Sequence, residues 1–138
     1  MDAKGRMAIP AKYRDEIDSR CGGVLVLTYS PFNNDSLFLY PEDFWEQVSA
    51  KIVELNGFDR TNQILQRRML GGATETQPDD NGRIQIPAQL RSVTGLEKRV
   101  VMMGLGNRFE IWNEAARDHA RRDELIDGPL DALPDLKI

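Results

Sequence analysis

The sequence of 138 residues has few of the side chains on which most enzyme and metal chemistry depends. It contains one Cys and one His, so an internal disulfide is excluded and a zinc site of ordinary spacing has too few ligands. It has no Gly-rich phosphate loop, no Gly-x-Ser-x-Gly and no His-Glu-x-x-His. We therefore expect no enzymatic activity, no cofactor, no metal and no small-molecule substrate.

Long hydrophobic runs are missing as well. No run approaches the roughly 18 apolar residues that a membrane-spanning helix needs. A lone Cys is typical of a reducing compartment, so we expect a cytoplasmic protein without membrane contact. The apolar fraction of 41% can form a core, and the 29% of charged residues with only seven prolines argues against disorder.

Positive charge is not in excess, since the net charge is −4. This balance taken alone disfavours nucleic acid as a partner. The excess of acid is concentrated in residues 113–138, with seven acidic and four basic residues, whereas residues 1–112 have fifteen and fourteen. A local basic tip on a nearly neutral body can bind phosphate, particularly when oligomerisation repeats it. The first fourteen residues form such a tip, because Asp2 is their one acidic residue and the basic residues are Lys4, Arg6, Lys12 and Arg14.

The strongest feature present is a stretch that occurs twice, at residues 2–14 and 79–91. Both copies contain Asp-x-x-Gly-Arg, an apolar residue, one spacer, Ile-Pro-Ala and an Arg four residues after the Pro, at a constant offset of 77 residues. Matches at so many fixed positions predict an internal duplication.

Each copy has the local pattern of a turn, a strand and a helix. Asp at the first position and Gly at the fourth are typical of a type I turn, in which the Asp side chain accepts from the backbone and Gly takes a positive φ. The alternation after Gly predicts a short strand with one buried face. The Pro keeps the preceding Ile extended and opens a helix at its first position. The turn-forming residues are Asp2, Gly5, Asp79 and Gly82.

The rest of the chain predicts further strands and helices. A hairpin turn also needs a strand before it. Residues 73–77 supply that strand for the second copy, but only Met1 precedes Asp2. Either the sequence is truncated before this copy, or the first half folds with an incomplete sheet, and we favour truncation. We expect Tyr40 and Trp112 to pack in the core or between the halves. The other predicted strands are 24–29, 37–40, 100–104 and 109–112, and the predicted helices are 43–55, 59–70 and 113–126.

These motifs resemble those of the MraZ family of bacterial transcriptional regulators, which have two SpoVT/AbrB-type halves. The resemblance continues through residues 37–41, 66–71 and 109–112 and covers about residues 2–112. It implies an α+β fold: a duplicated swapped-hairpin (SpoVT/AbrB-like) β-barrel with a short helix after each Asp-x-x-Gly-Arg strand and a linking helical pair. The expected division is a first half at 1–43, linking helices at 44–72, a second half at 73–116, and a charged helix and tail at 117–138.

The resemblance also implies a function. A member of this family is expected to form a ring-shaped homo-oligomer at the nucleoid. It would bind double-stranded DNA at short G-rich direct repeats upstream of the division and cell-wall gene cluster, usually as a repressor.

Three pairs of residues are the candidates for DNA contact. Arg6 and Arg83 each stand where a turn becomes a strand, and their planar forks suit the O6 and N7 atoms of guanine. Lys4 and Asn81, one residue before each Gly, are candidates for phosphate or a neighbouring base. The Arg residues that follow each Pro are candidates for contacts with the DNA backbone, but their spacing equally fits ion pairs within the fold; they are Arg14 and Arg91.

Two readings compete with DNA binding. In the first, each Asp-x-x-Gly-Arg motif is only a structural turn whose Arg pairs locally. The second alternative is a protein-interaction module, built on a duplicated barrel, that binds a partner through the edge carrying the turns. The acidic net charge favours that module slightly.

Overall fold

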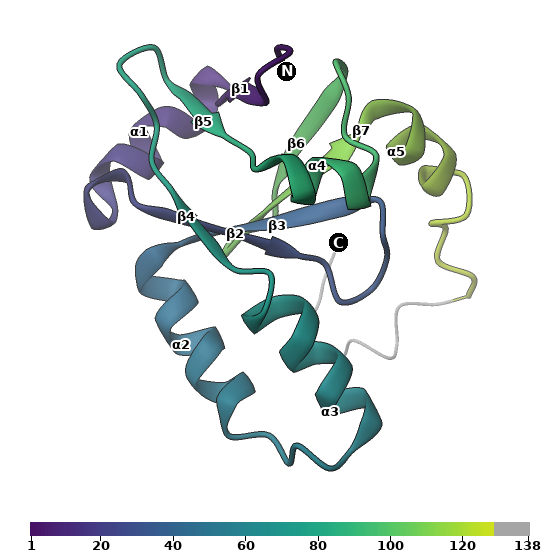
Figure 1. Cartoon of the computed structure of the whole chain (residues 1–138). Coiled ribbons are helices and arrows are strands. Elements are labelled where there is room, and N and C mark those ends of the chain that lie inside the picture. The colour runs from purple at the N-terminus through teal and green to yellow at the C-terminus, as the bar shows by residue number, and fades with distance from the viewer. Residues whose placement is uncertain (129–138) are drawn as a thin grey trace.

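The computed structural model describes residues 1–128 and has an α+β fold, as predicted. Five strands form one antiparallel sheet in the order β4-β2-β3-β7-β6, and β1 and β5 form a separate two-stranded ribbon (Figure 1). The strands are β1 (Arg6–Ala8), β2 (Leu25–Tyr29), β3 (Ser36–Pro41), β4 (Thr74–Thr76), β5 (Arg83–Gln85), β6 (Val100–Gly104) and β7 (Phe109–Asn113).

The helices lie around these sheets. In Figure 1, α2 and α3 project from one side of the five-stranded sheet, and the β1–β5 ribbon lies on the other. No helix within residues 1–128 is long and apolar enough to cross a membrane. The helices are α1 (Ala11–Ser19), η1 (Cys21–Gly23), α2 (Glu42–Val53), α3 (Arg60–Leu65), the π-helical turn η2 (Gln66–Leu70), α4 (Ala88–Thr94) and α5 (Glu114–Arg121).

The strand pairing has an approximate two-fold symmetry. At the centre β3 pairs with β7, and Leu37 lies opposite Ile111 while Leu39 lies opposite Phe109. β2 and β6 flank this centre in equivalent places. The halves interleave, because β4 pairs with β2 and β1 pairs with β5. Each half therefore completes its hydrogen bonding with strands from the other.

The predicted barrel is not formed. Among the described residues the five-stranded sheet is open, with β4 and β6 at its edges, and the two strands of the duplicated motif pair only with each other. These strands are three residues long and antiparallel. Each forms its backbone hydrogen bonds with the other, and neither bridges the edges of the larger sheet.

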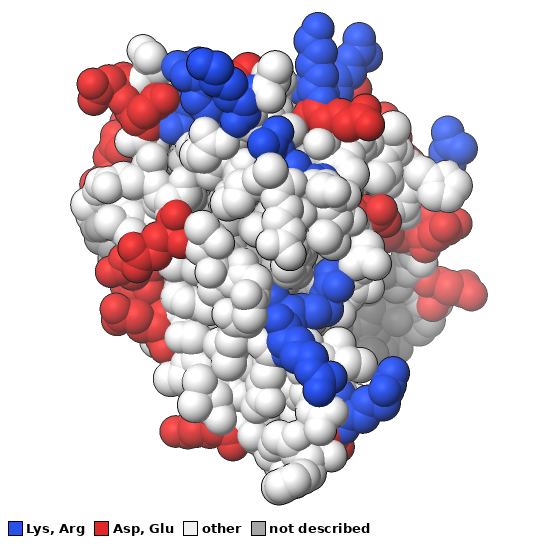
Figure 2. Space-filling view, in the orientation of Figure 1, with Lys and Arg blue, Asp and Glu red and all other residues white. Residues whose placement is uncertain are grey.

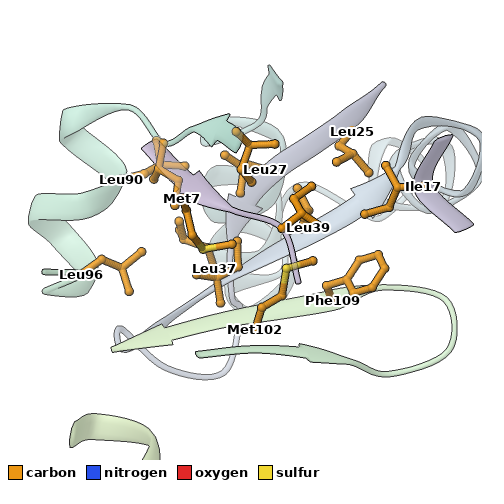
Figure 3. Packing of buried hydrophobic residues seen from close by; sticks show 14 residues of the cluster. Met7, Ile17, Leu25, Leu27, Leu37, Leu39, Leu90, Leu96, Met102 and Phe109 are labelled. Carbon is orange, nitrogen blue, oxygen red and sulfur yellow. The ribbon is translucent and has the colours of Figure 1, made fainter. Parts of the chain in front are cut away.

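The main core lies between the ribbon and the five-stranded sheet. Met7 and Ile84 are opposite each other in the ribbon, and both point into this core. Burying one such aliphatic side chain stabilises the fold by about 1.5–3 kcal/mol. Figure 3 shows Met7 packed among leucines of β2 and β3, with Leu90, Leu96, Met102 and Phe109 in the same cluster.

A second, smaller core joins the linking helices to the sheet. Phe38 and Tyr40 of β3 pack with Ile52 of α2 and Met69 of η2. Tyr40 and the equivalent Trp112 are both buried, which confirms their predicted place in the core. The linking helices thus cover the face of the sheet opposite the ribbon.

Arg68 anchors the end of the linking helices and makes within-fold contacts. Its Nε donates to the carbonyl of Ser30 at 2.7 Å, and its terminal nitrogens donate to Asn33 and Asn34 at 3.0 and 2.9 Å. The guanidinium also lies 5.4 Å from the centre of the Tyr29 ring. These contacts tie η2 to the loop between β2 and β3.

Most predicted elements are confirmed within a few residues, and three helices differ in where they begin or end. The prolines of the duplicated motif were predicted as the first helical residues, but they are the N-caps of α1 and α4, so each helix begins one residue later. The last helix ends at Arg121 instead of residue 126, and Arg117 pairs with Glu124 in the segment that follows. Part of the predicted tail, residues 129–138, lies outside the described residues.

Candidate nucleic-acid interface

The first Asp-x-x-Gly-Arg motif is a four-residue turn closed by hydrogen bonds. The Gly5 N–H donates to the Asp2 carbonyl at 3.1 Å, and the Asp2 N–H donates to the Arg6 carbonyl at 3.0 Å. The Asp2 side chain accepts from the N–H groups of Lys4 and Arg6, both at 2.9 Å. One carboxylate thereby satisfies two backbone donors inside the turn.

The second motif has the same geometry. The Gly82 N–H donates to the Asp79 carbonyl at 2.9 Å, and the Asp79 N–H donates to the Arg83 carbonyl at 2.8 Å. The Asp79 side chain accepts from the N–H groups of Asn81 at 2.8 Å and Arg83 at 3.0 Å. The duplication is therefore a duplication of hydrogen-bonding geometry as well as of sequence.

Both turns require glycine at the fourth position. Gly5 has a φ of +81° and Gly82 a φ of +72°, in the left-handed region that other residues adopt at a cost. A Cβ on Gly5 would lie 2.5 Å from the Arg91 Nε, and a Cβ on Gly82 would lie 3.1 Å from the Arg14 Nε. Each turn is thus packed against an Arg from the helix of the other half.

Arg14 and Arg91 support the turns from within the fold. The Arg14 Nε donates to the Ile9 carbonyl at 2.8 Å, and the Arg91 Nε donates to the Ile86 carbonyl at 3.0 Å. The spacing of these arginines was compatible with ion pairs within the fold. Both contacts do lie within the fold, but they are hydrogen bonds to backbone carbonyls. Contact of either Arg with the DNA backbone stays a prediction.

The ribbon holds the two turns side by side. Beyond the β1–β5 pairing, the Ile9 N–H donates to the Gly82 carbonyl and the Ile86 N–H donates to the Gly5 carbonyl, both at 2.9 Å. Each turn is consequently fixed to the strand of the other half. Because strand residues alternate between faces, Met7 and Ile84 face the core and leave the other face of the ribbon to residues 6, 8, 83 and 85.

Arg6 and Arg83 converge on one carboxylate. The Arg6 Nε lies 2.8 Å from the Asp2 Oδ2, and an Arg83 terminal nitrogen lies 3.7 Å from the same oxygen. The Arg83 Nε also lies 3.5 Å from the Asp79 Oδ2. The side chains of the two arginines are 37% and 31% exposed, so both forks are partly ordered yet reachable from solvent.

The electrostatics of the turns favour ionised carboxylates. The backbone N–H of Arg6, together with its side chain and the Lys4 N–H, lowers the pKa of Asp2. The backbone N–H of Arg83, followed by that of Asn81 and the arginine charges, lowers the pKa of Asp79. Both groups therefore remain charged at neutral pH and keep the arginines in place.

The outer ends of the turns are exposed. Lys4 and Asn81 both lie at the surface, one residue before each Gly. Figure 2 shows Lys and Arg gathered at the end of the molecule that carries the β1–β5 ribbon, with acidic side chains beside them. A second basic group lies over the linking helices. The surface is therefore mixed in sign, with local rather than overall positive charge.

Motif matching missed one residue on this face. Gln85 is exposed and lies directly opposite Arg6 in the ribbon. Its equivalent in the first copy is Ala8, so a search for identical positions passes over it. The period of two along the strand was the available signal, because it puts Gln85 on the same face as Arg83.

Fold and site together define a class of protein: a duplicated α+β chain that presents two turn-borne arginines on a ribbon shared by its halves. Comparison with known proteins agrees with the duplication. The family model of the MraZ protein matches residues 1–68 and 69–120. The chain belongs to the MraZ family.

Relatives of similar length support this assignment. A protein of Stenotrophomonas maltophilia is 41% identical over 139 positions, covering 100% of this chain and 94% of the relative. One from Xanthomonas oryzae pv. oryzae is 40% identical with the same coverage. One from Marinobacter nauticus is 42% identical over 137 positions, covering 96% of this chain and 91% of the relative. All three carry the name "Transcriptional regulator MraZ".

Proposed function

We propose that this protein is a sequence-specific DNA-binding transcriptional regulator that reads G-rich direct repeats through its two Asp-x-x-Gly-Arg turns. The observation that carries the proposal is that Arg6 and Arg83 lie diagonally across the solvent face of one short ribbon, where both approach the Asp2 carboxylate. The names of the relatives support a role in transcription.

The ribbon has a size and chemistry that suit the major groove. That groove of B-DNA admits a two-stranded β-ribbon, and its guanine edges offer the O6 and N7 acceptors to an Arg fork. The Asp2 carboxylate braces both arginines, which lowers the entropy that each fork loses on binding. In this proposal Arg6 and Arg83 read one guanine each.

The remaining candidates have supporting roles. Lys4 and Asn81 stand at the exposed tips and contact phosphate or a neighbouring base. Arg14 and Arg91 hold the turns against the ribbon, and their terminal nitrogens contact the DNA backbone. The interleaved strands support the swapped-hairpin arrangement of SpoVT/AbrB-type proteins as the scaffold.

A homo-oligomeric ring supplies the number of contacts that one chain lacks. Specific DNA complexes usually bury about 1,000 Å² or more of protein surface, and a single ribbon of two three-residue strands is small by comparison. The linking segment exposes apolar side chains suited to contact between subunits: Val53 at the end of α2 is 64% exposed, and Phe58 in the connection to α3 is 96% exposed. The ring would repeat the ribbon along direct repeats, on promoters in the nucleoid, and act as a repressor of the division and cell-wall gene cluster.

Fluorescence anisotropy with a labelled duplex tests this function. We expect tighter binding to spaced G-rich direct repeats than to a scrambled duplex, with a log–log salt slope near −0.9 for each phosphate neutralised. Light scattering in the same buffer should give a mass above that of the 15.7 kDa monomer. Equal binding to both duplexes, or none, would favour the protein-interaction module, for which salt should have little effect.

A further inference from the structure

Two equivalent positions on the solvent face of the ribbon, 8 and 85, carry different side chains. The two-fold symmetry of the ribbon relates Arg6 to Arg83 and Ala8 to Gln85. The register puts Gln85 opposite Arg6 and Ala8 opposite Arg83. One arginine therefore has an amide beside it, and the other has only a methyl group.

The Gln85 amide has a defined orientation. Its Nε2 donates to the carbonyl oxygen of Lys4 at 2.7 Å and to that of Ile86 at 3.4 Å. Both neighbours are carbonyl acceptors, so the NH2 group faces them and the Oε1 is turned away. The exposed part of Gln85 is consequently a hydrogen-bond acceptor next to the Arg6 fork.

An acceptor on this face selects among bases. In the major groove the amino groups of cytosine N4 and adenine N6 are the donors on base edges, whereas guanine and thymine present acceptors at the corresponding atoms. A fixed acceptor beside an Arg fork suits an amino-bearing base next to a guanine. Ala8, beside Arg83, has only a methyl group and therefore does not favour an amino-bearing base.

We propose that Gln85 is a specificity-determining residue that accepts a hydrogen bond from the amino group of a cytosine or adenine next to the guanine read by Arg6. This inference rests on the proposed function and adds an orientation to it. Because Ala8 lacks the amide, the ribbon reads the two ends of its site differently. The preferred site is therefore not a palindrome, and its direction is set by Gln85.

Selection from a duplex pool tests this assignment. The pool randomises every base pair of one G-rich repeat and of its flanks, and bound duplexes are sequenced, so that the preference for guanine and the preference at the neighbouring positions are both measured. The wild-type chain should prefer cytosine or adenine at one of these positions by about tenfold, the value of one good polar base contact. Gln85→Ala should remove that preference and keep the preference for guanine. Gln89→Ala, an exposed change on α4, is the matched control and should leave both unchanged.

The substitution Ala8→Gln restores the symmetry of the face. A Gln at this position is the two-fold equivalent of Gln85, with the Asn81 carbonyl in the place of the Lys4 carbonyl. We expect a second preference of about tenfold at the other end of the site, and weaker discrimination between the two orientations of a duplex.

Two results would overturn the inference, and they differ from each other. If Gln85→Ala retains the wild-type base preferences and only lowers the melting temperature, Gln85 is a structural brace for the first turn, while the proposed function stands. If the wild-type chain selects no guanine at all, the proposed function is wrong and the inference is overturned with it.

Discussion

The two turns share their backbone hydrogen bonds but differ in charge and packing. Residues 2–6 carry one acidic and two basic side chains, whereas residues 79–83 carry two acidic and one basic. Arg6 bonds tightly to the Asp of its own turn, while Arg83 lies 3.5 Å from Asp79. Both copies thus have the same backbone hydrogen bonds, but the charged side chains at their tips differ. The first turn therefore carries the larger positive charge, and the second holds its Arg less tightly.

The largest difference between the turns concerns their glycines. Gly5→Ala should destabilise the fold by about 2–5 kcal/mol, because strain at positive φ adds to overpacking against Arg91 and the fixed Ile86 carbonyl, 2.8 Å away. Gly82→Ala should cost about 1–3 kcal/mol, since its Cβ meets only a flexible Arg14 side chain at 3.1 Å. Urea denaturation of both variants measures the difference. Equal losses would show that the packing behind the two turns is equivalent.

The two reading arginines should each matter for DNA binding. Arg6→Ala and Arg83→Ala should each weaken binding to the direct-repeat duplex by about 1–3 kcal/mol and relax discrimination at one guanine. The double variant should lose less than the sum, because both side chains touch Asp2. Anisotropy titrations give these values, and Arg60→Ala at the exposed start of α3 is the control. Unchanged affinity with a lower melting temperature would favour the purely structural turn.

The charges at the tips should affect the salt dependence. Lys4→Ala should reduce the log–log salt slope by about 1, and Asn81→Lys should increase it by about 1, because each changes one phosphate contact. Binding constants at four or more salt concentrations give the slopes. If neither substitution alters the slope, the tips do not lie against the phosphates.

The smallest effect concerns acid. Both turn carboxylates have a lowered pKa in the folded chain, so they stabilise it when ionised. That contribution is present above the unfolded Asp pKa of about 3.9 and is lost as the pH falls through the lower folded values. The melting temperature should therefore drop more steeply below about pH 4 than in Asp2→Asn and Asp79→Asn variants. Parallel curves for all three chains would contradict this role.

Local structure followed from the sequence because its determinants are local. The spacing of Asp2 and Gly5, the period of two in the strands and the period of 3.6 in α2 each act over a few residues. The pairing of β1 with β5 did not follow, since strand partners 77 residues apart leave no local pattern. The expected barrel came from the family resemblance, and it too depends on pairing between distant strands, which no local pattern tests.

The contacts within the candidate site were predictable only in part. Matching positions identified Arg6 and Arg83 as candidates and Asp2 as a turn residue, but not the approach of Asp2 to Arg83, because that contact crosses the ribbon. The positions of Arg14 and Arg91 were compatible with two roles, and only the fold shows their Nε atoms on backbone carbonyls. Side-chain partners across the two halves are a property of tertiary structure.

The most direct test of guanine recognition by Arg6 and Arg83 removes one hydrogen-bond acceptor from the DNA. Anisotropy would compare a direct-repeat duplex with one in which the guanines are replaced by 7-deazaguanine, which keeps the base pair and O6 but lacks N7. If Arg6 and Arg83 read guanine as forks, the wild-type chain should bind the modified duplex about tenfold or more weakly, and an Arg6→Ala/Arg83→Ala chain should bind both duplexes equally. Equal binding of both duplexes by the wild-type chain, with affinity retained, would contradict the account.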